Sequence, residues 1–159
     1  MLKETLIFLG SHMNIRIARK EDAPGIAAQN MLLAEESEHM KLNPTTARAG
    51  VKRLLADPSK GFYLIAEENG TIIGQLMITV EWSDWRNKPI WWVQSVFVRK
   101  ESRKKGVFTR LLQEVQRRAR MEKVAFLRLY AYYKNLPALR AYKKTGWTQE
   151  PYKVYRHST

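Results

Sequence analysis

The stretch "QSVFVRKESRKKGVFTRLL", residues 94–112, decides how this chain should fold. An apolar run rich in β-branched residues, typical of a strand, leads into a cluster of Lys and Arg and then to the lone glycine Gly106. After Gly106 the apolar residues recur at helical spacing, at Val107, Phe108, Leu111, Leu112, Val115 and Ala119. The stretch therefore predicts a strand, a basic loop and an amphipathic helix in succession.

Such a junction can bind an anion, because the first N–H groups of a helix lack backbone partners and lie at the positive end of its dipole. Gly106 lets a ligand approach the backbone closely or lets the chain adopt a positive φ. Five cations surround it, namely Arg99, Lys100, Arg103, Lys104 and Lys105. Taken alone, these residues fit a solvated basic loop before a surface helix equally well.

The composition narrows the class of protein. The chain has 159 residues, enough for one domain with a real core, and its 28 Lys and Arg against 15 Asp and Glu give a net charge of +13. This balance favours polyanionic partners such as phosphorylated cofactors, nucleic acid or an acidic surface. The absence of cysteine excludes disulfides, thiolate metal sites and a cysteine nucleophile, and the three scattered His predict no metal site.

The N-terminal residues contain a short apolar run and a familiar tetrapeptide. The apolar run from Leu6 to Leu9 is too short for a signal peptide or a membrane span, so we expect a cytoplasmic protein that does not enter a membrane. The letters "GSHM" at residues 10–13 match a common expression-vector scar. Residues 1–12 are therefore either a native extension or a vector-derived segment, and residues 13–159 form the expected domain.

The remaining patterns predict alternating strands and helices. Asp22 and Pro24 mark the start of a first helix, and Asn69-Gly70 is a strong signal for a hairpin between two strands. The expected elements are a strand in 13–22, helices from 22 and from 43, strands on both sides of 69–70, a strand over 90–98, a helix from 106, a strand over 124–133, a helix over 135–146 and an edge strand in 148–158. This order predicts one α/β domain with a mixed sheet.

Two motifs resemble the GNAT superfamily of N-acetyltransferases. Residues 103–108, "RKKGVF", resemble its pyrophosphate signature R/Q-x-x-G-x-G/A, which follows a strand and opens a long helix. Residues 135–147 are similar to its downstream motif N-x-x-A-x-x-x-Y-x-x-x-G-F/W. The resemblance covers residues 14–155. It implies a twisted, mostly antiparallel sheet flanked by about four helices, with a splayed strand pair that binds acyl-CoA.

Phe108 departs from the signature, which has a small residue there. Its ring either turns into the core, continuing the apolar face through Leu111 and Val115, or narrows the pyrophosphate channel. We expect the first arrangement.

The resemblance also implies a site and a reaction. An amine would attack acetyl-CoA directly in a ternary complex, with no acyl-enzyme. Val96, Phe97 and Val98 would hold pantetheine and Asn135 would reach the same arm. Tyr142 would lie beside the cofactor as the general acid. The pyrophosphate would lie on backbone groups of Arg103, Lys104, Lys105, Gly106, Val107, Phe108 and Thr109.

The general base is less clear from the motifs. Some family members carry a glutamate at the position that Trp92 occupies here, and a tryptophan cannot accept a proton. An amine is mostly charged at neutral pH, so its proton must be removed before attack. The candidates are Glu81, Asp84 and a water relay past Gln94 and Ser95.

Acceptor residues are expected on two segments. Glu35, Glu36, Glu38 and His39 lie between the first two helices, where carboxylates could attract a cationic amine, although a solvated helix end explains them too. Aromatic and polar residues near the long loop could wall a pocket, and we expect Trp85, Trp92 and Gln94 to contribute. The acceptor itself is not identified, and a homodimer is compatible with the sequence.

Two other functions remain open at this point. A nucleic-acid or ribosome-binding module would use "RKKG", "QRRAR" and "LRAYKK" on phosphates, although Arg117, Arg118 and Arg120 fall on an exposed helix face and no known nucleic-acid motif is present. A family member that binds CoA without turnover would explain Phe108 and the missing glutamate. We therefore expect an acyl-CoA-dependent N-acetyltransferase, with nucleic acid not its partner.

Overall fold

The computed structural model describes residues 13–159, so the expectation for residues 1–12 lies outside it. Its five strands follow the chain order across one sheet, β1-β2-β3-β4-β5. All neighbours are antiparallel except β4 and β5, which are parallel. The strands are β1 (Asn14–Ile17), β2 (Phe62–Glu68), β3 (Thr71–Ser83), β4 (Lys88–Val98) and β5 (Leu127–Arg128). The expected single α/β domain with a mixed, mostly antiparallel sheet is confirmed.

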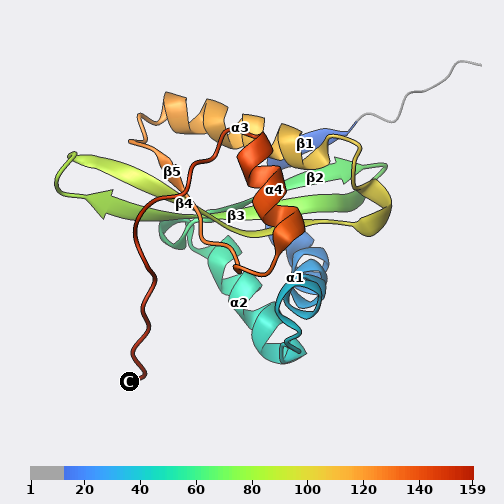
Figure 1. Ribbon diagram of the computed structural model, residues 1–159. Helices are drawn as coiled ribbons and strands as arrows, with labels where there is room; N and C mark the ends of the chain where they lie inside the picture. The colour runs from blue at the N-terminus through green and yellow to red at the C-terminus, as the bar shows by residue number, and fades with distance from the viewer. Residues whose placement is uncertain (1–12) are drawn as a thin grey trace, which may run out of the picture.

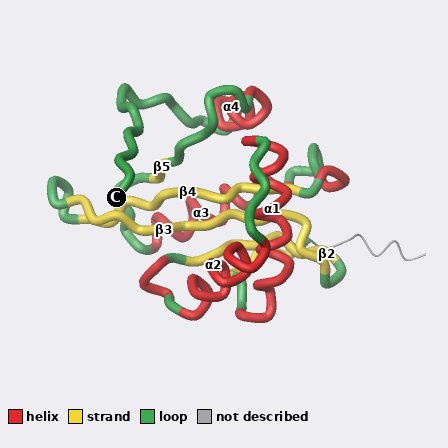
Figure 2. Tube along the Cα trace, turned by 90° about the horizontal axis from the view of Figure 1, so that it is seen from below, coloured by secondary structure: helices red, strands yellow, loops and turns green. Residues whose placement is uncertain are grey.

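Helices cover both faces of this sheet. One face carries α3, and the other carries α1 and α2, while α4 lies on the β5 side (Figure 1; Figure 2). Their bounds are α1 (Ala23–Glu38), α2 (Pro44–Ala56), α3 (Val107–Met121) and α4 (Leu136–Lys144), and short 3-10 helices span Lys20–Asp22, Pro58–Lys60 and Lys100–Ser102. Asn43 caps α2, its side chain accepting a hydrogen bond from Thr46 N at 3.0 Å.

The hairpin at Asn69-Gly70 is present as expected. Asn69 has φ 51° and Gly70 has φ 74°, as a primed two-residue turn requires. The second hairpin is longer than expected, because β3 continues to Ser83 and β4 begins at Lys88. The aromatic residues of this segment therefore lie on a long two-stranded arm.

Two apolar clusters hold the layers together. The larger one packs α3 on the sheet through the predicted stripe, including Leu111 and Val115, neither of which is exposed. The smaller one packs α1 and α2 on the opposite face around Ile26 and Ile65. Gly74 of β3 permits the close approach of α3, since a Cβ there would lie 2.7 Å from Val107 Cγ1.

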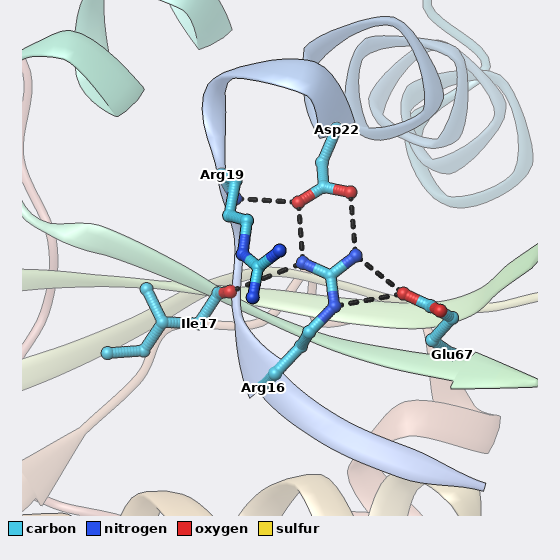
Figure 3. Close-up of polar contacts among 5 residues, drawn as sticks. All are labelled: Arg16, Ile17, Arg19, Asp22 and Glu67. Carbon is cyan, nitrogen blue, oxygen red and sulfur yellow. Dashed lines mark hydrogen bonds and ion pairs between the residues drawn. The ribbon is translucent and has the colours of Figure 1, made fainter. Parts of the chain in front are cut away.

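An ion-pair network fixes the start of α1 to the sheet edge (Figure 3). The Arg16 guanidinium of β1 binds Asp22 through two hydrogen bonds, of 2.7 and 2.9 Å, and also binds Glu67 of β2. Asp22 accepts a further hydrogen bond from Arg19 N at 2.6 Å. Asp22 occupies the N-cap position of α1, where the first helix was expected to start. Its carboxylate makes no capping bond to the helix, because the Arg16 guanidinium and Arg19 N bind the same oxygens.

Two expected strands are reduced or missing. The strand expected over 124–133 shrinks to Leu127–Arg128, and residues 148–158 form no strand. An edge strand needs a neighbour with a run of free N–H and C=O groups, and β5 offers only two residues. The C-terminal segment contacts β5 through side chains instead, with Arg128 Nε donating to Glu150 Oε2 at 2.9 Å.

Candidate active site

A β-bulge interrupts β4 at Ser95 and Val96. Gln94 pairs with Met77 and Phe97 pairs with Gln75, so three steps along β4 face two along β3. Ser95 has φ 50°, a left-handed conformation uncommon for a residue other than glycine. Non-glycine residues held in this conformation cluster at functional sites.

The outer edge of β4 is open beyond the point where β5 ends. The parallel pairing covers only Trp91–Leu127 and Trp92–Arg128. From Val93 to Val98, no strand in the described residues pairs with β4 on this side, and Figure 2 shows the chain after β5 leaving toward α4. The two strands are splayed, which leaves backbone N–H and C=O groups of β4 for an extended ligand.

The loop after β4 has a sharply turned backbone. Lys104 has φ 63° and Gly106 has φ 80°, two left-handed residues close together in the turn that opens α3. The hydrogen bond from Arg110 N to Gly106 O, at 3.0 Å, belongs to the first helical turn. The N–H groups of the residues before Arg110 thus precede the regular helical ladder.

The cations around this loop have different environments. Arg103 is engaged, because its Nε donates to Val98 O at 2.9 Å and its Nη2 donates to Glu36 Oε2 at 2.7 Å. Lys100 Nζ lies 3.5 Å from the same glutamate. Lys104 and Lys105 are exposed and form no ion pair within residues 13–159. These two lysines, rather than Arg103, have charge available for a ligand.

Phe108 turns inward as expected. It packs against the α3 cluster and meets the Tyr142 ring edge-on, with centroids 5.7 Å apart. Tyr142 also contacts Trp147 at 6.0 Å, and its burial raises the pKa of the hydroxyl to about 12. α4 thereby places Tyr142 beside the first turn of α3.

Asn135 caps α4. Its Oδ1 accepts a hydrogen bond from Ala138 N at 3.2 Å, so part of its role is structural. Gly146, with φ 87°, ends the same helix as expected.

Of the residues expected to supply a base or bind the acceptor, some lie near the bulge and others lie away from it. Glu81 accepts a 2.5 Å hydrogen bond from Trp92 Nε1 and lies 3.8 Å from Arg128. Gln94, nearer the bulge, donates to Thr79 Oγ1 at 2.6 Å and accepts from Tyr130 at 3.1 Å. The Glu81 carboxylate therefore interacts with the Trp92 indole and the Arg128 guanidinium, and Glu81 pairs with Ile90 of β4 rather than lying beside the bulge.

Two of the acceptor candidates lie apart from the site. Trp85 is 88% exposed at the tip of the β3–β4 arm. Seven residues of strand separate the start of β4 from Ser95, about 23 Å at the usual rise. Glu35 is exposed on α1 and is absent from the lining of the pocket beside the bulge. These two candidates therefore do not adjoin the bulge.

Glu38, in contrast, lines an open pocket beside the bulge. The pocket has a volume of about 210 Å³ and lies between α1, the segment after it and β4. Its lining consists of Asn30, Leu33, Ala34, Glu38, Leu42 and Ser95.

Sequence reasoning missed the buried polar residues beneath this pocket. Gln75 Nε2 donates to Asn30 Oδ1 at 2.7 Å, and Asn30 Nδ2 donates to the Tyr63 hydroxyl at 2.9 Å. Burial raises the pKa of Tyr63, and hydrogen bonding to Asn30 and Ser95 offsets part of this rise. Gln75 at an inward position of β3 was the one available signal, because buried amides need partners.

Other features bear on the alternatives. Arg117 and Arg118 both bind Glu114 on α3, at 2.7 Å each, so this basic run is partly neutralised. In residues 13–159, no group of His, Asp and Glu is arranged to bind a metal ion. No helix within that range has the length and apolar character needed to span a bilayer.

Comparisons with known proteins agree with this geometry. A family model described as the acetyltransferase (GNAT) family matches residues 28–147. The structure of a possible acetyltransferase from Clostridium difficile 630 is similar at 36% identity, with 92% of this chain and 97% of that chain covered and a TM-score of 0.87. No curated protein matches the chain.

More distant structures share the fold. A ribosomal-protein-alanine N-acetyltransferase from Brucella melitensis biovar Abortus 2308 is 16% identical, covering 93% of this chain and all of that chain, with a TM-score of 0.75. The aminoglycoside N-acetyltransferase AAC(6')-Iy in complex with CoA is 17% identical, with 96% and 99% covered and a TM-score of 0.78.

Proposed function

The chain belongs to the GNAT acetyltransferase family, and from this premise we propose that it transfers an acetyl group from acetyl-CoA to a primary amine. One observation carries the proposal: the bulge at Ser95 and Val96 adjoins an open strand edge that leads directly into the left-handed turn at the start of α3. A solvated basic loop would not need the strand beside it to be splayed and bulged.

The described residues fit acetyl-CoA. The open backbone edge of Val96, Phe97 and Val98 can hydrogen-bond the amides of pantetheine as a neighbouring strand would. The N–H groups from Lys104 through Thr109 suit the pyrophosphate, with Lys104 and Lys105 adding positive charge, whereas Arg103 N already donates to Lys100 O at 3.3 Å. When bound, acetyl-CoA supplies the thioester that the amine attacks.

The protein contributes mainly position and polarisation. It would hold the amine and the thioester together, which removes the entropy cost of their encounter. Tyr142 would act as the general acid, because its raised pKa keeps the hydroxyl protonated at neutral pH and able to donate to the leaving sulfur. Phe108 and Trp147 hold its ring in place.

Proton removal from the amine would use the polar groups at the bulge. Glu81 already binds Trp92 and lies near Arg128, whereas Gln94 and Ser95 lie at the bulge itself. We therefore favour a water relay past Gln94 and Ser95 over Glu81 as the route for the proton. The bulge is where the amine must approach the thioester.

The proposal is tested by following thiol release from acetyl-CoA with a panel of primary amines. We expect turnover in the wild type and a loss of kcat, with little change in the Kd for acetyl-CoA, in Tyr142→Phe. Tight CoA binding without thiol release from any amine would replace this proposal with a CoA-binding protein that lacks turnover.

A further inference from the structure

The pocket beside the bulge has a polar group at each end and an apolar middle. Asn30, Leu33, Ala34 and Glu38 form one stripe along α1. Eight residues separate Asn30 from Glu38, about 12 Å along the axis of a helix. Leu33 and Ala34 lie between these ends on α1, and Leu42 is the other apolar residue of the lining, so an aliphatic chain suits the pocket.

The Glu38 end carries negative charge without a partner. Its neighbour Glu36 is neutralised by Arg103 at 2.7 Å and faces Lys100 at 3.5 Å. Glu38 forms no ion pair with any residue from 13 to 159, although the chain carries a net charge of +13. A carboxylate at the edge of a pocket, surrounded by a basic protein but left unpaired, is complementary to a cationic ligand.

The opposite end is neutral and held in a fixed orientation. A chain of hydrogen bonds runs from Gln75 Nε2 to Asn30 Oδ1 and from Asn30 Nδ2 to the Tyr63 hydroxyl. Gln75 and Tyr63 are only 0% and 2% exposed. The Asn30 oxygen accepts one hydrogen bond and has a second lone pair. Buried Gln75 Oε1 has no partner in the described residues. This end lacks a formal charge and suits an uncharged amine that donates N–H bonds.

From these two ends we infer that the acceptor is a primary amine with a second, charged nitrogen at the far end of a short aliphatic chain. The inference rests on the proposed acetyl transfer and names the class of acceptor for it. The reacting amine lies at the Ser95 end beside the bulge, and the retained ammonium lies against Glu38. The neutral amine attacks the thioester carbonyl, and the amide C–N bond forms as the C–S bond breaks. The proton from the nitrogen passes to the water relay, and the CoA sulfur leaves as the thiol after taking a proton from Tyr142. The distant ammonium keeps its charge.

Three matched acceptors test the inference: 1,4-diaminobutane, butylamine and 4-aminobutanoate. They share a four-carbon chain and differ in the charge at its far end. We expect kcat/KM for the diamine to exceed that for butylamine by about fivefold, the upper range for an exposed ion pair. The aminobutanoate should react slowest, because its carboxylate meets Glu38.

Variants at Glu38 separate charge from shape. Glu38→Gln should bring the diamine and butylamine to within about twofold of each other, and Glu38→Lys should favour 4-aminobutanoate over the diamine. Glu122→Gln removes the same charge at the end of α3, on the other face of the sheet, and should keep the wild-type preference. Glu38 is exposed, so these variants should fold.

The outcomes distinguish this inference from the proposed function. Equal rates with diamine and butylamine, or a preference that survives Glu38→Gln, would overturn the class of acceptor while leaving acetyl transfer intact. If acetyl-CoA binds but no amine reacts, calorimetric titration of the CoA-loaded protein with diaminobutane tests whether the pocket recognises the dication. Binding that Glu38→Gln weakens would support the recognition of a dication without transfer, and binding that ignores the substitution would refute it.

Discussion

Gly106→Glu should strongly weaken acetyl-CoA binding through charge rather than through misfolding. A Cβ at Gly106 meets nothing within 4 Å, so a side chain has room, but φ is 80° and any L-residue there is strained. That strain costs about 1 to 2 kcal/mol of folding stability. A carboxylate about 6 Å from one phosphate charge repels it by about 2.8 kcal/mol at an effective dielectric constant of about 20, roughly a hundredfold in Kd.

The matched control is Gly106→Gln, which has the same shape and the same backbone strain without the charge. Calorimetric titration with acetyl-CoA, at low and high salt, should show a loss of about a hundredfold for Glu and a much smaller loss for Gln. Thermal unfolding should show the same cost for both. Equal weakening by the two variants, or wild-type affinity in Gly106→Glu, would refute the assignment of the pyrophosphate to this loop. Binding that disappears in salt and prefers a DNA oligonucleotide would favour the nucleic-acid alternative.

Three further predictions concern stability and catalysis. Gly74→Ala should lower the free energy of unfolding by about 1 to 3 kcal/mol, because its Cβ would collide with Val107. Gly50→Ala, at an exposed position of α2, should raise the free energy of unfolding by about 0.5 to 1 kcal/mol. Chemical denaturation of both variants tests this, and equal shifts would contradict the packing argument. Tyr142→Phe should lower kcat and should also reduce the loss of folding stability at alkaline pH. In the folded protein the Tyr142 hydroxyl has a pKa of about 12 and keeps its proton, whereas in the unfolded chain its pKa is near 10 and the proton is lost. The wild type should therefore lose about 2 to 3 kcal/mol more than the variant between pH 10 and 12, as measured by unfolding at each pH. Arg16→Gln should cost about 1 to 2 kcal/mol at neutral pH. Because Arg16 keeps the pKa of Asp22 below its usual value, wild-type stability is lost as the pH falls through that carboxyl's range, and acid titration of unfolding should show a shallower limb in the variant.

The sequence was sufficient for those parts of the fold that depend on local chemistry. Asn69-Gly70 requires positive φ at two successive residues, and the stripe through Leu111 and Val115 has only one face to bury, so both could be predicted. The short β5 could not be predicted, because "VAFLRLYAYY" has strand composition throughout and the length of β5 depends on where its pairing with β4 ends.

The candidate site was predictable where a motif specifies backbone shape and not where side chains meet across the fold. Gly106 could be placed from the motif, whereas the engagement of Arg103 by Glu36 joins residues 67 positions apart. The same holds for Asn30, Tyr63 and Gln75, whose hydrogen bonds link α1, β2 and β3. Trp85 was expected among the acceptor residues because of the aromatic residues around it, and the length of the β3–β4 arm places it far from the bulge.

The sequential order of the strands bears on how the molecule folds. β2, β3 and β4 are joined by tight turns, so their pairing closes only short loops and costs little chain entropy before contacts form. β1 must instead close over α1 and α2, and β5 pairs with β4 only after α3 has been laid down between them. We therefore expect the bulged edge of β4 to be among the first surfaces assembled. The strand proposed to bind acetyl-CoA, β4, would then be held by its pairing in the β2–β3–β4 meander before most of the remaining chain has folded.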